Sequence, residues 1–364
     1  MVYFDNSSTT YVYPEVIETI TDVLKNHFGN PSNLYTFGLE SKMLIEDARS
    51  RIAGCLKVEP EELIFTSCAS ESNAMAINQC EKCLCSPYDH HDIKDNKKSI
   101  IIDEDYLIRC EQMDYATQLY YKQLYKNYLW SHTLVSSETG EIFDVEAMAQ
   151  PAKRLGMKVL VDATQALGNI PVFPHDYPSV DFMSFSLHKC HAPKGIGLLY
   201  IKKDLLKDII PLIYGTQENN IRGGTSNVPY IVGGALAVEK SIQEILQKQI
   251  HCKDIKDYIL NRLNDYGMDY IENRGVNNLN SVLNIAFKNI TGESIMLMLD
   301  AEGICVSTGT ACTSGDLKPS DALMDMEVPP EYIQGAIRIS IGLQNTLEDA
   351  EKLVQNLKKI TKTS

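Results

Sequence analysis

The feature that most constrains the fold is an alternation of short apolar runs with longer amphipathic stretches over the first 250 residues. Short apolar runs bounded by turn residues are typical of strands, and apolar residues spaced three and four apart are typical of helices. The expected strands are residues 63–66, 99–102, 134–136, 158–162, 180–186 and 196–201, and the expected helices are residues 14–26, 39–56, 70–80, 145–155 and 229–247. This order predicts an α/β fold with a mostly parallel sheet, and functional groups at the carboxyl ends of its strands.

Beyond residue 250 the order changes to helix, strand (281–287), helix, strand (336–341) and helix, which predicts a smaller α+β domain. We therefore expect a large α/β domain over residues 14–249 and a smaller one made of residues 1–13 and 250–364. Residues 80–133 give no clear architecture. Their Cys80, Cys83 and Cys85 could bind a metal, but no fourth ligand is apparent, so we expect a thiol-rich loop or helix start and no metal.

Charge and composition exclude several classes of protein. The formal net charge is −14, and no basic run is longer than Lys97–Lys98, so a nucleic acid partner is not expected. The N-terminus lacks the basic and apolar regions of a signal peptide, and no apolar run approaches the roughly 18 residues of a membrane span. The ten cysteines are therefore expected in the reducing cytoplasm, as free thiols, ligands or catalytic groups.

The most informative segment ends a predicted strand at Ser186 and continues through His188 and Lys189 to a Pro-Lys-Gly turn. A lysine at a strand end could hold an aldehyde cofactor covalently, with the flanking hydroxyl and imidazole donors binding its phosphate. Alone, such a lysine is more often a solvated charge. Asp162 ends the preceding apolar strand, where a carboxylate either pairs with a cationic ring nitrogen or caps a helix. Together, Asp162 and Lys189 are more specific than either residue.

Three further positions carry candidate chemistry. Ser70 opens a helix after the strand at 63–66, where backbone N–H groups form either an anion site or a capping box. Cys312 lies among small residues, as a mobile nucleophile would, although an inert loop thiol is the commoner case. Arg338 on a predicted strand could bind a carboxylate through two hydrogen bonds.

The order of these segments resembles the motif series of the cysteine desulfurases, which are class V, fold-type-I enzymes dependent on pyridoxal 5'-phosphate (PLP). The matching segments span nearly the whole chain and are residues 3–10, 29–33, 65–73, 137–140, 162–168, 184–197, 222–227, 312–320 and 336–340. The resemblance implies a two-domain homodimer that removes sulfur from L-cysteine, releases L-alanine and passes the sulfur to an acceptor protein. The cysteine loop resembles the type with an extended, mobile loop.

The resemblance also implies a role for each matching residue. Lys189 would bind the PLP aldehyde, and Cys312 would attack the substrate sulfur and carry it as a persulfide. The other PLP contacts would come from Ala69, Ser70, Ser137, Asp162, Gln165, Ser186, His188 and, from the second subunit, Thr225. The substrate would be bound by Asn33 and by Arg338, which takes its carboxylate.

Two departures from the family pattern concern the PLP ring. Family members carry a histidine after a strand, which stacks on the ring and moves protons. We align residues 99–106 with that position, which places Glu104 there and no histidine. An asparagine of the family is also replaced, by Ser136-Ser137. Losing a proton-transfer group costs about 10²–10⁴-fold in rate. Three hypotheses stay open: a slow cysteine desulfurase, a family enzyme with altered chemistry or substrate, and a non-catalytic binding protein.

Overall fold

The computed structural model describes residues 1–103, 105–308 and 320–362. The chain forms two compact units: unit 1 comprises Met1–Thr9, Val135–Phe143 and Glu244–Ser364, and unit 2 comprises Thr10–Leu134 and Asp144–Gln243. This division differs from the expected one mainly at residues 135–143, which belong with the C-terminal unit. The reason is backbone pairing, because Ile142 N–H donates to the carbonyl of Asn277 and Leu279 N–H donates to the carbonyl of Gly140, each at 2.8 Å.

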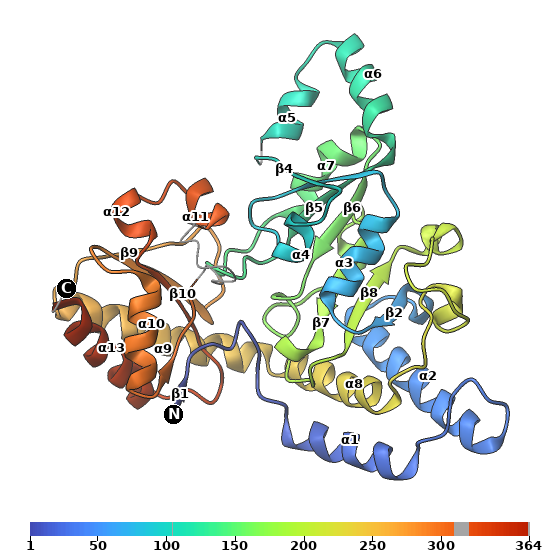
Figure 1. Ribbon diagram of the computed structural model, residues 1–364, viewed down its shortest axis with the longest axis horizontal. Helices are drawn as coiled ribbons and strands as arrows, with labels where there is room; N and C mark the ends of the chain where they lie inside the picture. Colours follow the sequence, from blue (N-terminus) through green and yellow to red (C-terminus); the bar gives the residue numbers. More distant parts are fainter. Residues whose placement is uncertain (104, 309–319, 363–364) are drawn as a thin grey trace. The chain divides into compact units, whose positions relative to one another are not determined.

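Unit 2 is built on a seven-stranded sheet of order β2-β8-β7-β6-β5-β3-β4 (Figure 1). The strands are β2 (Leu63–Thr66), β3 (Lys82–Cys85), β4 (Ser99–Ile101), β5 (Tyr128–Thr133), β6 (Lys158–Asp162), β7 (Phe182–Ser186) and β8 (Gly197–Ile201). β8 runs antiparallel to both of its neighbours, and the remaining pairs are parallel. The predicted α/β class with a mostly parallel sheet is confirmed.

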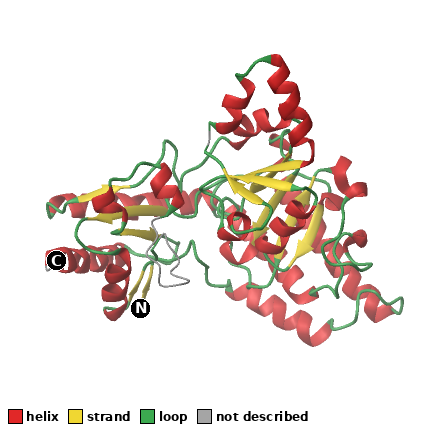
Figure 2. Ribbon diagram, turned by 45° about the horizontal axis from the view of Figure 1, so that its top comes forward, coloured by secondary structure: helices red, strands yellow, loops and turns green. Residues whose placement is uncertain are grey.

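The helices of unit 2 are red and the strands yellow in Figure 2. They are α1 (Pro14–Asn26), α2 (Thr36–Leu56), α3 (Ala69–Asn78), α4 (His91–Lys94), α5 (Tyr106–Glu111), α6 (Tyr115–Leu124), α7 (Val145–Arg154) and α8 (Val228–Gln243). Short 3-10 turns are η1 (Pro60–Glu62), η2 (Tyr125–Asn127), η3 (Pro174–Asp176), η4 (Leu187–Lys189), η5 (Lys203–Asp208) and η6 (Glu218–Asn220). α3 packs on β6, β7 and β8, and α7 packs on β5 and β6, so apolar side chains of these strands form the core.

Two strands differ from the sequence prediction. β5 occupies residues 128–133 instead of 134–136, and β3 was not expected to be a strand. β3 carries Cys83 and Cys85, both fully buried, because a buried free cysteine behaves as a small hydrophobic residue. Burial raises the pKa of Cys85 to about 12, so its thiol stays protonated. Within the described ranges, no group of three or more acidic, cysteine or histidine side chains could hold a metal ion.

Unit 1 contains two small sheets. β10 (Val282–Phe287) pairs antiparallel with β9 (Tyr270–Glu272) and β12 (Ala336–Ser340), and β1 (Val2–Tyr3) pairs parallel with β11 (Ile304–Cys305). Their helices are α9 (Ile245–Asp265), α10 (Gly292–Ala301), α11 (Asp321–Asp325), α12 (Pro330–Ile333) and α13 (Leu347–Lys362). The predicted strands near 281–287 and 336–341 are thus confirmed. In the part of the chain that the structure describes, no helix has the length and apolarity to cross a membrane.

Candidate active site

The carboxyl ends of the central strands bring the key residues of unit 2 together. Asp162 ends β6 and Ser186 ends β7, and η4 follows at once with Lys189 as its last residue. Across the sheet, Gly197 of β8 pairs with both Ser186 of β7 and Thr66 of β2. A side chain at Gly197 would come within 2.7 Å of the Cys68 backbone, so this glycine lets the start of α3 approach the end of β7.

The backbone around Lys189 is firmly anchored within unit 2. The backbone N–H and the hydroxyl of Thr10 donate to the carbonyl of His188, at 3.1 and 2.9 Å. After the lysine, the His191 N–H donates to Thr10 Oγ1 at 2.9 Å, and the His191 ring stacks on Tyr13 with centroids 4.2 Å apart. His191 also has a left-handed φ of 66°. Lys189 therefore projects from a fixed turn, and only its own side chain needs to move.

The Asp162 carboxylate is buried and held by two donors. Its exposed fraction is 6%, Oδ1 accepts from the Thr164 N–H at 2.9 Å, and Oδ2 accepts from the Asn73 amide at 3.3 Å. Gln165, also buried, lies one turn further on, where its carbonyl accepts from Asn169. Both oxygens of Asp162 are thus fixed by neutral donors, which leaves its charge to be matched by a cation.

An imidazole that the sequence analysis missed belongs to the same cluster. His90 follows β3, its Nδ1 lies 3.2 Å from Asp92 Oδ1, and its side chain is 52% exposed. The hydrogen bond to Asp92 raises the pKa of His90, and burial opposes this rise. The charge of Asp162 also raises the pKa of His90, whereas the charge of Lys189 lowers it. The alignment that placed Glu104 at the position of the family's ring-stacking histidine overlooked this imidazole.

The cause of the error is the strand that was overlooked. Because β3 is a sheet strand beside β5, the pair Asp89-His90 follows a strand end in the way that the family pattern requires. Residues 99–106, which we had aligned there, begin with the edge strand β4 one position further out. Glu104 itself lies outside the described residues. The available signal was the acid–histidine pair Asp89-His90, which begins four residues after Cys85.

The start of α3 offers donors for an anion. Its N-cap residue, Cys68, makes no side-chain capping hydrogen bond among the described residues, and the next residues are the buried Ala69 and the exposed Ser70. Ser186 is buried at the end of β7. Burial lowers the pKa of His188 to about 4, with help from the charges of Lys189 and Lys194, so its ring is neutral near pH 7. An uncapped helix start with neighbouring hydroxyl groups suits a phosphate.

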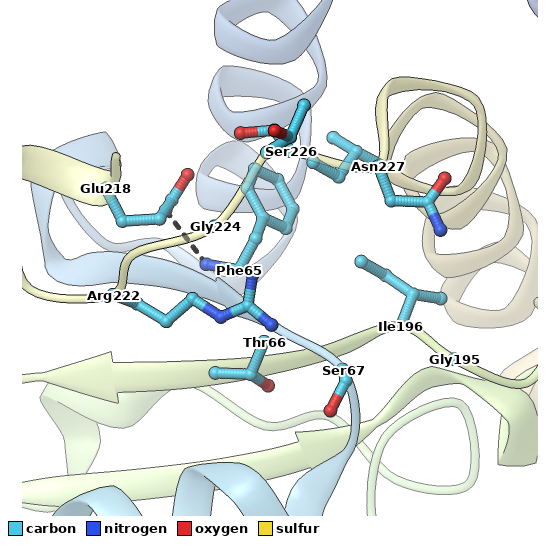
Figure 3. A pocket seen from close by; sticks show the side chains of 12 residues that line it. Phe65, Thr66, Ser67, Gly195, Ile196, Glu218, Arg222, Gly224, Ser226 and Asn227 are labelled. Carbon is cyan, nitrogen blue, oxygen red and sulfur yellow. Dashed lines mark hydrogen bonds between the residues drawn. The ribbon is translucent and has the colours of Figure 1, made fainter. Parts of the chain in front are cut away.

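Thr225 lies in an exposed glycine-rich loop and lines a cavity of about 190 Å³. Figure 3 shows this cavity with the neighbouring loop residues Gly224 and Ser226. Two ion pairs hold this loop within unit 2. Arg222 Nε donates to Glu71 of α3 at 2.7 Å, and Arg49 Nη1 donates to Glu218 at 2.8 Å. Glu218 also accepts from the Phe65 N–H, the dashed line of Figure 3. The loop is therefore a fixed surface feature, and its exposed Thr225 is presented outward.

In unit 1, Arg338 of β12 is 8% exposed at its side chain and already has three oxygen partners. Its Nη2 donates to Asp5 Oδ1 at 2.8 Å and to Ser8 Oγ at 2.7 Å, and its Nη1 donates to the carbonyl of Ser137 at 2.8 Å. Among the described residues its buried Nε has no partner. Ser137 thus contacts the arginine through its backbone, and its predicted contact with PLP stays a prediction.

Two other predicted residues lie apart from these clusters. Asn33 is in the exposed turn before α2, where its amide donates to the Tyr35 hydroxyl at 3.1 Å. Its role in substrate binding stays a prediction. Cys312 falls in residues 309–319, outside the described residues.

Comparisons with known proteins agree with this arrangement. The model of the aminotransferase class-V family matches residues 2–353. Cysteine desulfurase IscS of Dictyoglomus turgidum is 36% identical over 99% of this chain and 94% of its own length. Cysteine desulfurase NifS of Azotobacter vinelandii is 30% identical, over 98% and 91%.

Solved structures give the same result. A NifS-like protein matches with a TM-score of 0.85 and 30% identity over the full length of both chains. A NifS-like protein from Rickettsia africae matches with a TM-score of 0.84 and 25% identity over 99% of both chains. The predicted fold-type-I class is confirmed by these neighbours. The chain belongs to the aminotransferase class-V family and, within it, to the family of the cysteine desulfurases.

Proposed function

We propose that this protein uses PLP to convert L-cysteine into L-alanine, with the sulfur retained as a persulfide on Cys312. The observation that carries the proposal is the cluster of Lys189, Asp162 and His90 at one edge of the unit 2 sheet. The charges of Lys189 and Asp162 both act on the His90 ring, and a lysine, a buried acid and an imidazole are the groups that a PLP enzyme of this family needs. His90 also removes the main reason for expecting altered chemistry or a non-catalytic role.

The residues of unit 2 fit PLP at both ends of the cofactor. Asp162 is a buried carboxylate whose hydrogen-bond donors are neutral, so a protonated ring nitrogen of PLP would supply the positive charge that pairs with it. Gln165 would contact the phenolic oxygen of the cofactor. The uncapped start of α3 with Ala69 and Ser70 would take the phosphate, together with Ser186 and His188. Lys189 would hold the aldehyde. PLP, when bound, supplies an electron sink for carbon atoms next to the substrate nitrogen.

The chain's own residues then perform three tasks. Asp162 is oriented by hydrogen bonds from the Asn73 amide and the Thr164 N–H, so that it would pair with the ring nitrogen of the cofactor. Lys189, projecting from the anchored turn, would hold the cofactor and could hold or release a proton at Nζ. His90, in the place of the family's ring-stacking histidine, would hold and move a proton. Arg338 would orient the substrate through its carboxylate.

Sulfur transfer balances as a two-electron substitution. The thiolate of Cys312 attacks the sulfur of L-cysteine, an S–S bond forms, and the C–S bond breaks with its electron pair passing to carbon. That carbon takes up a proton, which gives L-alanine, and the persulfide sulfur is then available to an acceptor protein.

Every cysteine in the described ranges is a free thiol, which supports a reducing compartment such as the cytoplasm.

A homodimer is part of the proposal, because Thr225 would contact the phosphate of the second subunit. Exposed apolar side chains on unit 2 support it. Phe28, Leu34, Met43 and Tyr214 are 77%, 89%, 70% and 78% exposed, as residues of a subunit interface would be in an isolated chain. An obligate interface of more than about 2,000 Å² would cover such residues.

The test is product analysis with purified protein, PLP and L-cysteine. Wild-type protein should release alanine and, with a reductant, an equal amount of sulfide. Cys312→Ser should retain the yellow absorption of lysine-bound PLP while alanine release collapses. Cys305→Ser is the matched control, since burial raises the pKa of the Cys305 thiol and β11 holds it in a strand. Alanine release by Cys312→Ser at the wild-type rate would contradict the proposal.

A further inference from the structure

We propose that Asp92 is a positioning residue that sets the tautomer of His90, so that Nε2 is the nitrogen that gains and releases the proton. The use of that proton in catalysis rests on the proposed function, whereas the tautomer is a property of the chain itself. The aspartate lies two residues after the histidine, in the first turn of the short helix α4. No other proposed role in the active site accounts for it.

The geometry gives His90 Nδ1 two alternative partners on the same residue. Nδ1 lies 3.2 Å from Asp92 Oδ1 and 3.4 Å from the Asp92 backbone nitrogen. A protonated Nδ1 donates to the carboxylate, whereas a bare Nδ1 accepts from the backbone N–H as a helix cap. The carboxylate therefore decides between the two, because an anion favours the state with hydrogen on Nδ1.

Asp92 is itself held as a charged group. Its side chain is 18% exposed, and the Asn73 amide donates to its two oxygens at 3.3 and 3.5 Å. Burial acts to raise the pKa of Asp92, but hydrogen bonds with His90, Ser70 and Asn73 outweigh it and lower the pKa. The same Asn73 amide also contacts Asp162, so one buried amide fixes both carboxylates.

The charged groups around His90 support a proton on Nδ1. Asp92 acts most strongly through its hydrogen bond and raises the pKa of the ring, and burial opposes this. Asp162 raises the pKa further, and Lys189 lowers it. Because Asp92 lies closest to Nδ1, its effect falls on that nitrogen, which leaves Nε2 as the site of proton exchange. An imidazole oriented by an aspartate in this way accepts and donates through the opposite nitrogen.

The decisive experiment is ¹⁵N NMR of the full-length protein, labelled only at its eight histidines, over a range of pH. The His90 signals are identified by their loss in His90→Gln. In wild-type protein, neutral His90 should carry its hydrogen on Nδ1 and titrate above the ordinary pKa of about 6.5. Asp92→Ala should lower that pKa and move the hydrogen to Nε2, since only the backbone N–H then remains for Nδ1.

Two further variants complete the design. Asp92→Asn keeps an acceptor but removes the charge, so the pKa of His90 should fall while much of the Nδ1–H tautomer remains. Asp95→Asn is the matched control, because Asp95 faces the exposed His91 at 3.7 Å and should leave His90 unchanged. Unchanged signals of the buried His191, which lies apart from both aspartates in the sequence, report that each variant is folded.

The outcomes separate this proposal from the proposed function. If Asp92→Ala keeps the wild-type tautomer, or if wild-type His90 carries its hydrogen on Nε2, the positioning role is overturned regardless of activity. If the tautomer changes as expected but wild-type protein releases no alanine, the positioning role stands and the proposed function fails. Where both hold, the pH profile of alanine release should shift to lower pH in Asp92→Asn, in step with the pKa of His90.

Discussion

The two units treat their buried charges differently. In unit 2, the groups around Asp162 leave an accessible side, because Ser70 is exposed and the His90 side chain is half exposed. In unit 1, the Arg338 guanidinium is enclosed and already donates to Asp5, Ser8 and the carbonyl of Ser137. One unit therefore presents exposed polar groups to a ligand, whereas the other presents a cation whose anionic partner is already in place.

This difference implies that a phosphate group and a substrate carboxylate would bind with different free energies. A phosphate at the start of α3 would meet an N-cap residue that makes no side-chain capping hydrogen bond among the described residues. A carboxylate at Arg338 must share or replace the contact with Asp5, a pair that lies 2.8 Å apart. Tight binding of the cofactor and weaker, exchangeable binding of the substrate are what a turnover cycle requires, and the following predictions test each side of this contrast.

The largest effect is expected at Lys189, the residue of unit 2 that would hold the cofactor. Lys189→Ala should abolish the yellow absorption of lysine-bound PLP and reduce alanine release to the background rate. The turn around it is anchored through Thr10 and His191, so the fold should persist. Absorbance with excess PLP and a thermal unfolding curve measure the two properties. Unchanged colour in this variant would remove Lys189 from its assigned role.

The next largest effect is expected at His90. His90→Gln should lower kcat by about 10²–10⁴-fold, the usual contribution of a proton-transfer group, while PLP remains bound. His91→Gln is the control, since His91 is its exposed neighbour on the same short helix. Equal losses in the two variants would show that α4, rather than the imidazole of His90, is what matters. Alanine release at saturating L-cysteine is the measurement.

A smaller effect concerns the unfolding free energy of the protein, which the buried Asp89 of unit 2 should make dependent on pH. Asp89 is 3% exposed, its Oδ1 has no hydrogen-bond partner among the described residues, and burial raises its pKa to about 6. The native state thus binds this proton more tightly than the unfolded chain, whose aspartates titrate near pH 3.9. The stabilisation is complete below about pH 4 and is lost as the pH rises through 6.

Asp89→Asn removes that dependence, because the amide carries no charge at any pH. The gain in unfolding free energy should be larger at pH 8 than at pH 5, by about 1–2 kcal/mol. Urea unfolding at the two pH values is the measurement, with the exposed Asp95→Asn as control. A gain that is the same at both pH values would mean that Asp89 is not ionised in the native protein near neutrality.

Local sequence patterns predicted much of the fold and part of the site. Ser186 and Lys189 could be placed because an apolar run, a turn and the polar residues are contiguous. β3 could not, since Cys-Leu-Cys does not look like a strand, and with it His90 was lost. The partners of Arg338 were hidden for another reason, because Asp5 lies 333 residues away and the pair depends on how β1 and β12 are brought together.

That distant pair gives the smallest effect and the sharpest test of the contrast. Asp5→Asn keeps an oxygen for Arg338 but removes the competing charge, so the guanidinium becomes more available to a substrate carboxylate. The KM for L-cysteine should fall by about 3- to 10-fold, equivalent to about 0.7–1.4 kcal/mol, with kcat little changed. Ser8→Ala is the control, because it removes only a neutral acceptor at 2.7 Å from the same Nη2. If Asp5→Asn instead raises KM, then Asp5 orients the arginine for its ligand and does not compete with it. The buried charges of both units would then serve to orient groups that bind a ligand.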